Sequence, residues 1–161
     1  MRRQARLAWL ALALALVAID LATKGLYPYD GTYHRVVVEG LLSFRPVYNA
    51  AGIWSFPIPS VVLIVATALA VPLLALWILL PPHARAWESA GKALVLGGAA
   101  GNLYDRLAHD GRVRDFIDVI VPVVRYKWPT FNVADMAIVV GIGLLLVAGF
   151  RGKGAAEAAP G

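Results

Sequence analysis

The sequence predicts a mainly α-helical integral membrane protein with four transmembrane helices. Hydrophobic residues make up 60% of its 161 residues and charged residues only 16%, whereas a soluble domain has about 45–50% apolar and about 25% charged residues. So small a globule cannot hide that surplus of apolar side chains, which makes lipid the expected solvent. Four apolar stretches are each near the ~20 residues that cross a bilayer as a helix. We expect one membrane domain over residues 1–151.

The first stretch, residues 7–26, follows three arginines, which is also how a secretory signal peptide begins. The apolar run Leu7–Ile19 continues beyond Asp20, and no small-x-small cleavage site leads into a polar mature start. A retained first helix is therefore favoured over a cleaved signal.

The other three apolar stretches cover residues 58–80, 89–107 and 131–150. The first of these contains Pro72, which a membrane helix tolerates where neighbouring groups satisfy the freed carbonyl. The stretch 89–107 is the least hydrophobic, and its small-xxx-small pattern lets helices pack closely. The segment that follows the last span, residues 152–161, is rich in Gly and Ala and is expected to be a flexible tail.

Four spans place both chain termini on one side of the membrane. With the termini in the cytoplasm, the basic residues of the two faces tie in number, but the shorter inner segments carry the higher basic density. We therefore expect cytoplasmic termini and two long outer segments, residues 27–57 and 108–130. β-Branched and aromatic residues in Thr32–Val38 suit short strands. We expect a small outer sheet and, in 108–130, a partly helical loop.

Composition also excludes several chemistries. The chain has no cysteine, which rules out disulfides, thiolate metal sites and a cysteine nucleophile. The three histidines lack metal-binding spacing, and no serine lies in a Gly-x-Ser-x-Gly turn. The sequence implies no metal and no cofactor. A net charge of +5 indicates contact with anionic lipid head groups rather than with nucleic acid.

Ionisable residues in or beside the spans are the strongest functional signal. A charge at the centre of a membrane helix costs about 2.5–3.5 kcal/mol, so such residues usually face a cavity. Asp135 stands at the start of the fourth span, where stabilisation by the helix dipole is the alternative interpretation. Asn132, however, is the better capping residue. Asp115 and Asp118 are three residues apart and share a face if their segment is helical.

A hairpin return of the chain between these segments could bring Asp135 opposite one of the two earlier acids. Two carboxylates in a low-dielectric cleft cannot both ionise easily, so they share a proton and can activate a water molecule between them. One carboxylate then acts as base toward the water and the other as acid toward the substrate carbonyl. The pattern predicts peptide hydrolysis without a metal or a covalent intermediate.

Two further charge pairs each have two interpretations. Asp20 and Lys24, spaced i,i+4, either neutralise each other in the membrane or position the substrate or the acid pair. Asp105 and Arg106 form either a structural ion pair or a clamp for backbone carbonyls.

Five short blocks stand in a fixed order along the chain: Asp20–Lys24, Asn49–Phe56, Gly97–Leu107, Val113–Asp118 and Phe131–Asp135. Their order, and their placement against four spans, resemble the lipoprotein signal peptidase (signal peptidase II) family of membrane aspartic peptidases. The resemblance covers about residues 10–150, and the third and fifth blocks together are its most specific part.

The resemblance implies an aspartic endopeptidase that removes the signal peptide from prolipoproteins by cleaving before the diacylglyceryl-modified lipobox cysteine. The implied fold has four transmembrane helices, a small extracytoplasmic β-cradle and a short outer helix. The implied location is the bacterial inner (cytoplasmic) membrane, with the active site near the outer leaflet. Expected partners are a lipid-modified prolipoprotein, membrane lipid and a globomycin-type inhibitor, and the chain is expected to be a monomer.

In the resemblance, Asp115 and Asp135 match the catalytic aspartates, and Asp118 matches a frequent but non-catalytic acid. The substrate-binding or site-supporting residues are Asp20, Lys24, Asn49, Gly52, Asn102, Asp105, Arg106, Asn132 and Ala134. The chain departs from the family pattern at Ala51, where Gly is common, which puts substrate contacts near Asn49 in doubt. It also departs at Arg114, where an apolar residue is commoner and a charge can perturb the pKa of Asp115.

Two other functions remain open on the sequence alone. One is a small proton- or cation-coupled transporter that uses Asp20, Asp115 and Asp135, and the other is a non-enzymatic assembly factor. A peptidase needs Asp115 and Asp135 side by side at a cleft, a conduit needs carboxylates along a water-filled path, and a scaffold needs no paired acids.

Overall fold

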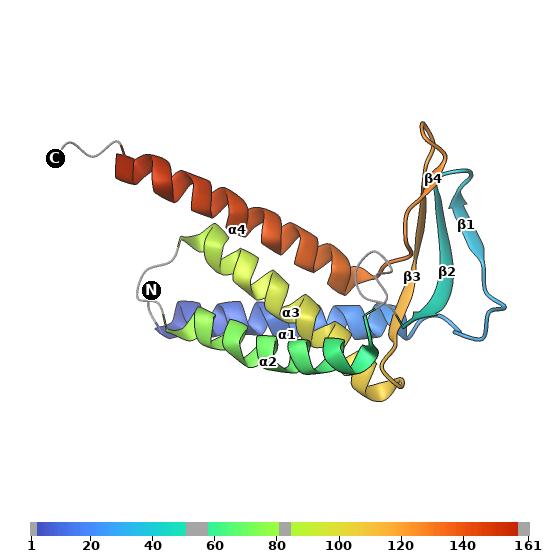
Figure 1. Cartoon of the computed structure of the whole chain (residues 1–161), viewed down its shortest axis with the longest axis horizontal. Coiled ribbons are helices and arrows are strands. Elements are labelled where there is room, and N and C mark those ends of the chain that lie inside the picture. The colour runs from blue at the N-terminus through green and yellow to red at the C-terminus, as the bar shows by residue number, and fades with distance from the viewer. Residues whose placement is uncertain (1–2, 51–57, 81–84, 158–161) are drawn as a thin grey trace.

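The computed structural model describes residues 3–50, 58–80 and 85–157. Four long helices run alongside one another, and a small sheet stands across one end of them (Figure 1). The order of elements is α1 Arg3–Lys24, β1 Arg35–Val38, β2 Leu42–Asn49, α2 Ser60–Leu79, α3 Ala86–Ala108, β3 Val113–Val121, β4 Tyr126–Lys127 and α4 Val133–Glu157.

Three of the helices are long and apolar enough to cross a membrane: Gln4–Lys24 in α1, Ser60–Leu79 in α2 and Val133–Phe150 in α4. Their outer faces carry exposed apolar side chains, among them Leu69 on α2 and Val139 on α4. Apolar surface of that extent is suited to lipid rather than to water. The structure thus supports three of the four predicted transmembrane helices by length and composition.

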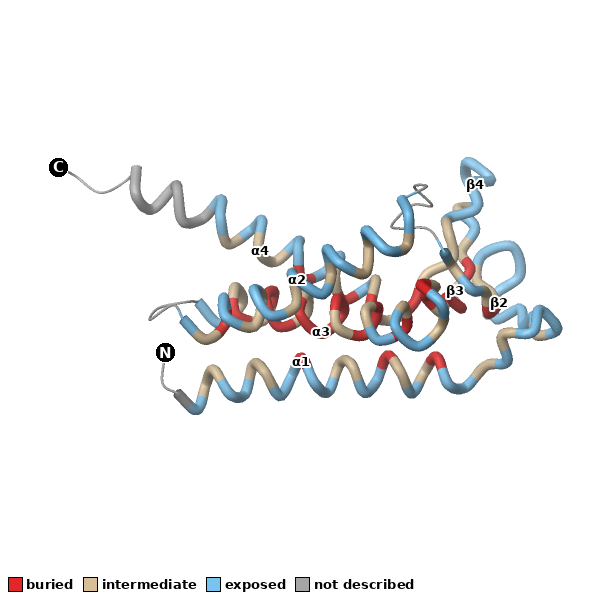
Figure 2. The backbone as a smooth tube through the Cα atoms, turned by 60° about the horizontal axis from the view of Figure 1, so that its bottom comes forward, coloured by how far each residue is buried: buried red, intermediate tan, exposed pale blue. Residues whose placement is uncertain are grey.

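Helix α3 occupies the centre of the bundle and packs against α1, α2 and α4. Buried residues gather along it (Figure 2). A Cβ atom at Gly97 would lie 2.8 Å from the carbonyl oxygen of Ala13 in α1, and one at Gly98 would meet the carbonyl of Ala134 in α4. Glycine therefore lets the neighbouring backbones approach closely. Because α3 faces protein, its low hydropathy and its charges do not conflict with its helical structure.

The sheet is antiparallel, with strand order β1-β2-β3-β4. Strand β2 pairs with β3 in a register that sets Asn49 opposite Val113 and Ser43 opposite Asp118. The register shifts between Phe44 and Val47, where the intervening Pro46 has no N–H to donate to the ladder. The predicted small sheet is confirmed, and β1 lies within the segment whose composition predicted strands.

The expected helical segment in 108–130 is wrong. Between His109 and Thr130, a segment that the structure describes throughout, the chain forms turns and the strands β3 and β4. The local sequence Val-Arg-Asp-Phe-Ile-Asp-Val-Ile-Val is rich in β-branched residues, and pairing with β2 buries it. Side chains three apart on a strand point to opposite faces, so Asp115 and Asp118 do not share one.

Helix α4 extends beyond the apolar stretch that ends at residue 150. Helix α4 continues to Glu157, so residues 152–157 belong to a helix, and residues 158–161 lie outside the described part of the chain. Ala and Glu in this segment are good helix formers. They prolong the helix although the same segment contains glycine.

Candidate active site

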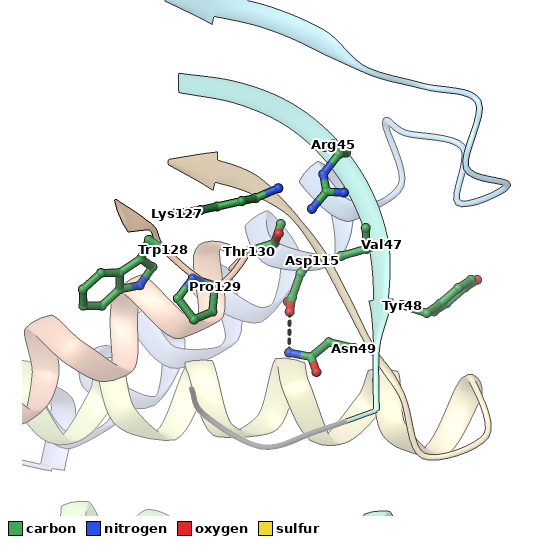
Figure 3. Close-up of a pocket in the computed structure, with 9 residues that line it drawn as sticks. All are labelled: Arg45, Val47, Tyr48, Asn49, Asp115, Lys127, Trp128, Pro129 and Thr130. Carbon is green, nitrogen blue, oxygen red and sulfur yellow. Dashed lines mark hydrogen bonds between the residues drawn. The ribbon is translucent and has the colours of Figure 1, made fainter. Parts of the chain in front are cut away.

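Asp115 lies near the start of β3, and its side chain is almost completely buried, at 1% exposure. Its Oδ1 accepts a hydrogen bond from Asn132 Nδ2 at 2.6 Å, and its Oδ2 accepts one from Asn49 Nδ2 at 2.9 Å. Figure 3 shows the second of these bonds, which joins β3 to the end of β2. Both carboxylate oxygens are thus held by amide donors.

Asp135 lies in the first turn of α4 and takes part in a reciprocal cap of that helix. The side-chain oxygen of Asn132 accepts the backbone N–H of Asp135 at 2.9 Å, and Asp135 Oδ2 accepts the backbone N–H of Asn132 at 3.2 Å. This is the arrangement of a capping box. The other oxygen, Oδ1, accepts a bond from Asn102 Nδ2 of α3 at 2.8 Å. The cap and α3 together fix the orientation of this carboxylate.

Asn132 brings the two aspartates together. Its side-chain amide donates to Asp115 while its backbone N–H donates to Asp135. The chain reaches this position because Phe131 pairs with Ile117 of β3 immediately before α4 begins. Acids that are 20 residues apart in the sequence therefore contact a single asparagine.

The electrostatics of the site favour a shared proton. Burial, and after it the neighbouring Asp135 carboxylate, raise the pKa of Asp115 to about 7. The hydrogen bonds from Asn49 and Asn132 stabilise the ionised form and oppose that rise. Two interacting carboxyl groups release their protons as a pair. Near neutral pH such a pair can hold one proton and leave one carboxylate ionised.

A buried network of charged side chains lies next to the residues that hold Asp115 and Asp135. Asp20, Lys24 and Asp105 have fully buried side chains. Lys24 Nζ contacts Asp20 Oδ2 at 2.7 Å, Asp105 Oδ2 at 3.0 Å and Asn102 Oδ1 at 3.2 Å. An ammonium group has three protons to donate, so this lysine is fully satisfied. Asp20 and Lys24 do neutralise each other, as one interpretation of the sequence proposed.

The same network also touches the elements that carry the aspartates. Asp20 Oδ1 accepts the backbone N–H of Ala134 at 2.9 Å, in the first turn of α4. Asn102 accepts bonds from both Lys24 and Asn132 and donates to Asp135. The positioning interpretation of Asp20 and Lys24 therefore has a direct structural basis.

Arg106 does not form the ion pair with Asp105 that the sequence suggested. In the described part of the chain, Asp105 pairs instead with Lys24, Arg114 and, at 3.9 Å, His109. Arg106 Nη1 contacts the carbonyl of Asn102 at 3.5 Å, and its buried Nε has no hydrogen-bond partner among the described residues. Adjacent residues on a helix point in different directions, which is why the two side chains separate.

A cavity of about 410 Å³ opens above Asp115, between β2 and the segment that follows β4 (Figure 3). Its volume is in the range of small-ligand and peptide clefts. Its lining residues are Arg45, Val47, Tyr48, Asn49, Asp115, Lys127, Trp128, Pro129 and Thr130.

Asp118 faces away from the pair and has its own partners. Its Oδ2 contacts Lys127 Nζ at 3.2 Å and Arg45 Nε at 3.4 Å. These two cations neutralise its charge. Sequence reasoning missed Arg45 and Lys127, since nothing local in the sequence indicates that they share a partner. The predicted Gly52, and Ala51 beside it, lie outside the described residues.

The chain is similar to several known proteins. The family profile described as signal peptidase (SPase) II matches residues 12–151. The chain is 34% identical to the "Lipoprotein signal peptidase" of Pseudomonas paraeruginosa, over 99% of this chain and 97% of the relative. It is 39% identical to that of an Azoarcus species, over 97% of this chain and 90% of the relative.

A solved structure has the same fold. It is titled "Bacterial membrane enzyme structure by the in meso method at 2.3 A resolution" and superposes with a TM-score of 0.82. The alignment covers 96% of this chain and 94% of the other at 21% identity. At that identity the likeness concerns the fold alone.

Proposed function

This chain belongs to the signal peptidase II family, and we propose that Asp115 and Asp135 are the catalytic pair with which it removes signal peptides from prolipoproteins. The observation that carries the proposal is the contact of Asn132 with both carboxylates. Burial supports it, because it lets Asp115 retain a proton near neutral pH. The chain is thus a membrane peptidase of bacterial type.

The reaction follows from one proton shared by two carboxyl groups. The ionised carboxylate takes a proton from a water molecule. The oxygen of that water attacks the scissile carbonyl carbon at the same time. The protonated carboxyl group donates its proton to the carbonyl oxygen, and a tetrahedral diol forms. Transfer of a proton to the amide nitrogen then allows the C–N bond to break, which releases an amine and a carboxylic acid and restores one proton to the pair.

The surrounding residues support this chemistry by position. Asn49, Asn102 and Asn132 each donate a side-chain N–H to one of the two aspartates. Such donors stabilise a carboxylate in a low-dielectric site without adding a charge. We assign Asp20, Lys24 and Asp105 to the support of these groups, and Ala134 to the anchoring of α4 on Asp20. We assign Arg106, whose Nη1 lies 3.5 Å from the carbonyl of Asn102, to contact with the substrate backbone.

The membrane arrangement is part of the proposal. Helix α3 has 23 residues, and at 1.5 Å per residue it is about 34 Å long, enough for a hydrocarbon core of about 30 Å. We propose that it crosses the membrane inside the bundle, as the fourth span of an inner-membrane protein with cytoplasmic termini. The sheet lies at the opposite end of α1 from the N-terminus (Figure 1). This sheet, and with it Asp115 on β3 and Asp135 in the first turn of α4, is then near the outer leaflet.

The residues that line the cleft support a more detailed proposal for the substrate. An acylated prolipoprotein can approach sideways from the bilayer, and cleavage before its diacylglyceryl-modified cysteine leaves the lipid chains in the membrane. The cavity above Asp115 combines Trp128 and Pro129 with the cations of Arg45 and Lys127, so it suits a chain with both apolar and polar groups. A globomycin-type cyclic peptide is expected to compete for it, and the chain is expected to act as a monomer.

The two rival functions have less support. A conduit needs carboxylates spaced along a path, whereas Asp115 and Asp135 both contact Asn132. A scaffold gives no reason to bury an acid pair. The relatives described above bear the name of a peptidase, and nothing in the comparisons favours a transporter.

The test is cleavage by purified protein of a lipid-modified prolipoprotein, followed as a mobility shift on a gel. We expect Asp115→Asn and Asp135→Asn to abolish cleavage while the protein inserts and folds. Asp110→Asn is the matched control, because Asp110 is exposed and has a φ of 54°, a conformation that asparagine readily adopts. Cleavage at the wild-type rate by either active-site variant would refute the assignment.

A further inference from the structure

Arg114 binds the buried carboxylate of Asp105 at three points. Its Nε and Nη2 contact Asp105 Oδ1 at 3.0 and 2.8 Å, and its backbone N–H donates to Asp105 Oδ2 at 2.9 Å. We propose that Arg114 is a positioning residue that holds Asp115, the next residue in β3, in place against Asp135. The proposal rests on the assignment of these two aspartates as the catalytic pair.

The placement of Asp105 on α3 explains how this contact reaches the reacting groups. Asp105 stands three residues after Asn102, so the two side chains lie on one face of the helix. Asn102 donates to Asp135 at 2.8 Å, while Asp105 holds Arg114 and with it the start of β3. One turn of α3 therefore fixes both aspartates, one through each of these residues.

The charges of the network require a second cation. Asp20 and Asp105 are fully buried carboxylates that share a single buried ammonium group, that of Lys24. With both carboxylates ionised, those three groups together carry one negative charge. The guanidinium group of Arg114, which is 15% exposed, makes the set neutral. An uncompensated negative charge in so buried a position is costly, and it would also repel the carboxylate of Asp115.

A nearby arginine serves as a matched control. Arg112 pairs with Asp110 at 3.2 Å, but these side chains are 41% and 91% exposed, against 15% and 0% for Arg114 and Asp105. Exposed pairs of this kind contribute little. Arg112 also donates to the carbonyl of His109 at 3.2 Å and stacks 4.6 Å over the Tyr48 ring. The variants Arg112→Met and Arg114→Met therefore remove the same charge two residues apart in the chain, and only the second breaks an ion pair with a buried carboxylate of α3.

The experiment measures kcat and KM for cleavage of a lipid-modified prolipoprotein by wild type, Arg114→Met, Arg114→Lys and Arg112→Met. Displacement of a reacting group by about 1 Å can cost on the order of 100-fold in rate. We expect kcat of Arg114→Met to fall by about 10- to 100-fold with KM unchanged, because substrate binding does not use this side chain. Arg114→Lys, which keeps the charge but can make fewer bonds, should recover part of the loss, and Arg112→Met should match wild type.

Several outcomes would overturn the proposal. An unchanged kcat in Arg114→Met would show that Asp115 is positioned without this contact, and a raised KM at constant kcat would make Arg114 a substrate-binding residue. Loss of folded protein in both Arg114 variants, judged by thermal unfolding in detergent, would make it a residue of the fold alone. Failure of the catalytic assignment is separate, since it would appear as cleavage by Asp115→Asn.

Discussion

Replacement of Asn132 by alanine removes two interactions that can be separated by a second variant. The alanine variant loses the amide donor that contacts Asp115 at 2.6 Å and the oxygen that caps the N–H of Asp135 at 2.9 Å. Serine at this position is as good an N-cap as asparagine, but it is shorter and has no amide to donate to Asp115. Asn132→Ser therefore keeps the helix cap and loses the side-chain contact with Asp115.

The two losses have different magnitudes and different readouts. Loss of an N-cap costs about 0.5–2 kcal/mol of stability, so Asn132→Ala should be less stable than Asn132→Ser by roughly that amount. A hydrogen bond to a charged group is worth about 1.5–3 kcal/mol. If this whole free energy is lost from the transition state, each amount of about 1.4 kcal/mol lowers the rate tenfold. We therefore expect kcat to fall by about 10- to 150-fold in both variants.

The pH profile gives a third readout with a definite sign. The bond from Asn132 stabilises the ionised form of Asp115 and so holds its pKa down. Without it the pKa of Asp115 rises further above its ordinary value, so the pair keeps its shared proton to higher pH and the alkaline limb of the kcat profile moves to higher pH. The assays are the gel shift of prolipoprotein across a pH series and thermal unfolding in detergent. Wild-type kcat in Asn132→Ser, or a profile that does not move, would refute this account of Asn132.

Three further predictions follow from burial and close packing. Since the fold raises the pKa of Asp115 from 3.8 to about 7, the contribution of Asp115 to stability should be fully present below about pH 4 and be lost as pH rises through 7; Asp115→Asn should remove that part of the pH dependence in thermal unfolding, and an equal slope between pH 4 and 7 in both proteins would contradict it. Gly98→Ala places a Cβ against the backbone of Ala134 and should cost about 1–3 kcal/mol, whereas Gly143→Ala, with nothing within 4 Å, should not destabilise the protein by the same unfolding assay. Lys24→Met leaves the buried carboxylate of Asp20 without its cation and Asp105 with Arg114 as its remaining close cation, and it should cost about 3–5 kcal/mol; a stability within 1 kcal/mol of wild type would show that water or proton uptake replaces the lysine.

The polar residues of the site could be selected from the sequence because a membrane makes them costly. Asp20, Lys24 and Asp135 stand in otherwise apolar helices, and that contrast is visible without a structure. The cap of α4 could also be predicted, because Asn132 followed three residues later by an acid is a local pattern. The polar residues in apolar helices and the cap of α4 could both be predicted because each depends on residues within one or two helical turns in the sequence.

The strand that carries Asp115 could not be predicted in this way. Two acids three residues apart suggest a helix face, whereas the strand forms because β2 and Phe131 pair with it from distant parts of the chain. The pairing of Arg114 with Asp105 depends on a reversal after α3, where Asp110 and Gly111 have φ values of 54° and 81°. Glycine just beyond a helix is a signal for such a turn, but it does not indicate which side chains meet after it.

Helix α3 has a low hydropathy because it carries polar side chains that hold the two aspartates. A uniformly apolar helix would cross the membrane more easily, but it would have no groups with which to hold two carboxylates. Asn102 and Asp105 supply those groups, and glycines at 97, 98 and 101 bring α1 and α4 close enough to keep lipid away from them. Burial by neighbouring helices is therefore what permits charge in α3, and the same burial raises the pKa of Asp115. Burial by the neighbouring helices thus accounts for two properties: the low hydropathy that α3 can tolerate and the raised pKa of Asp115.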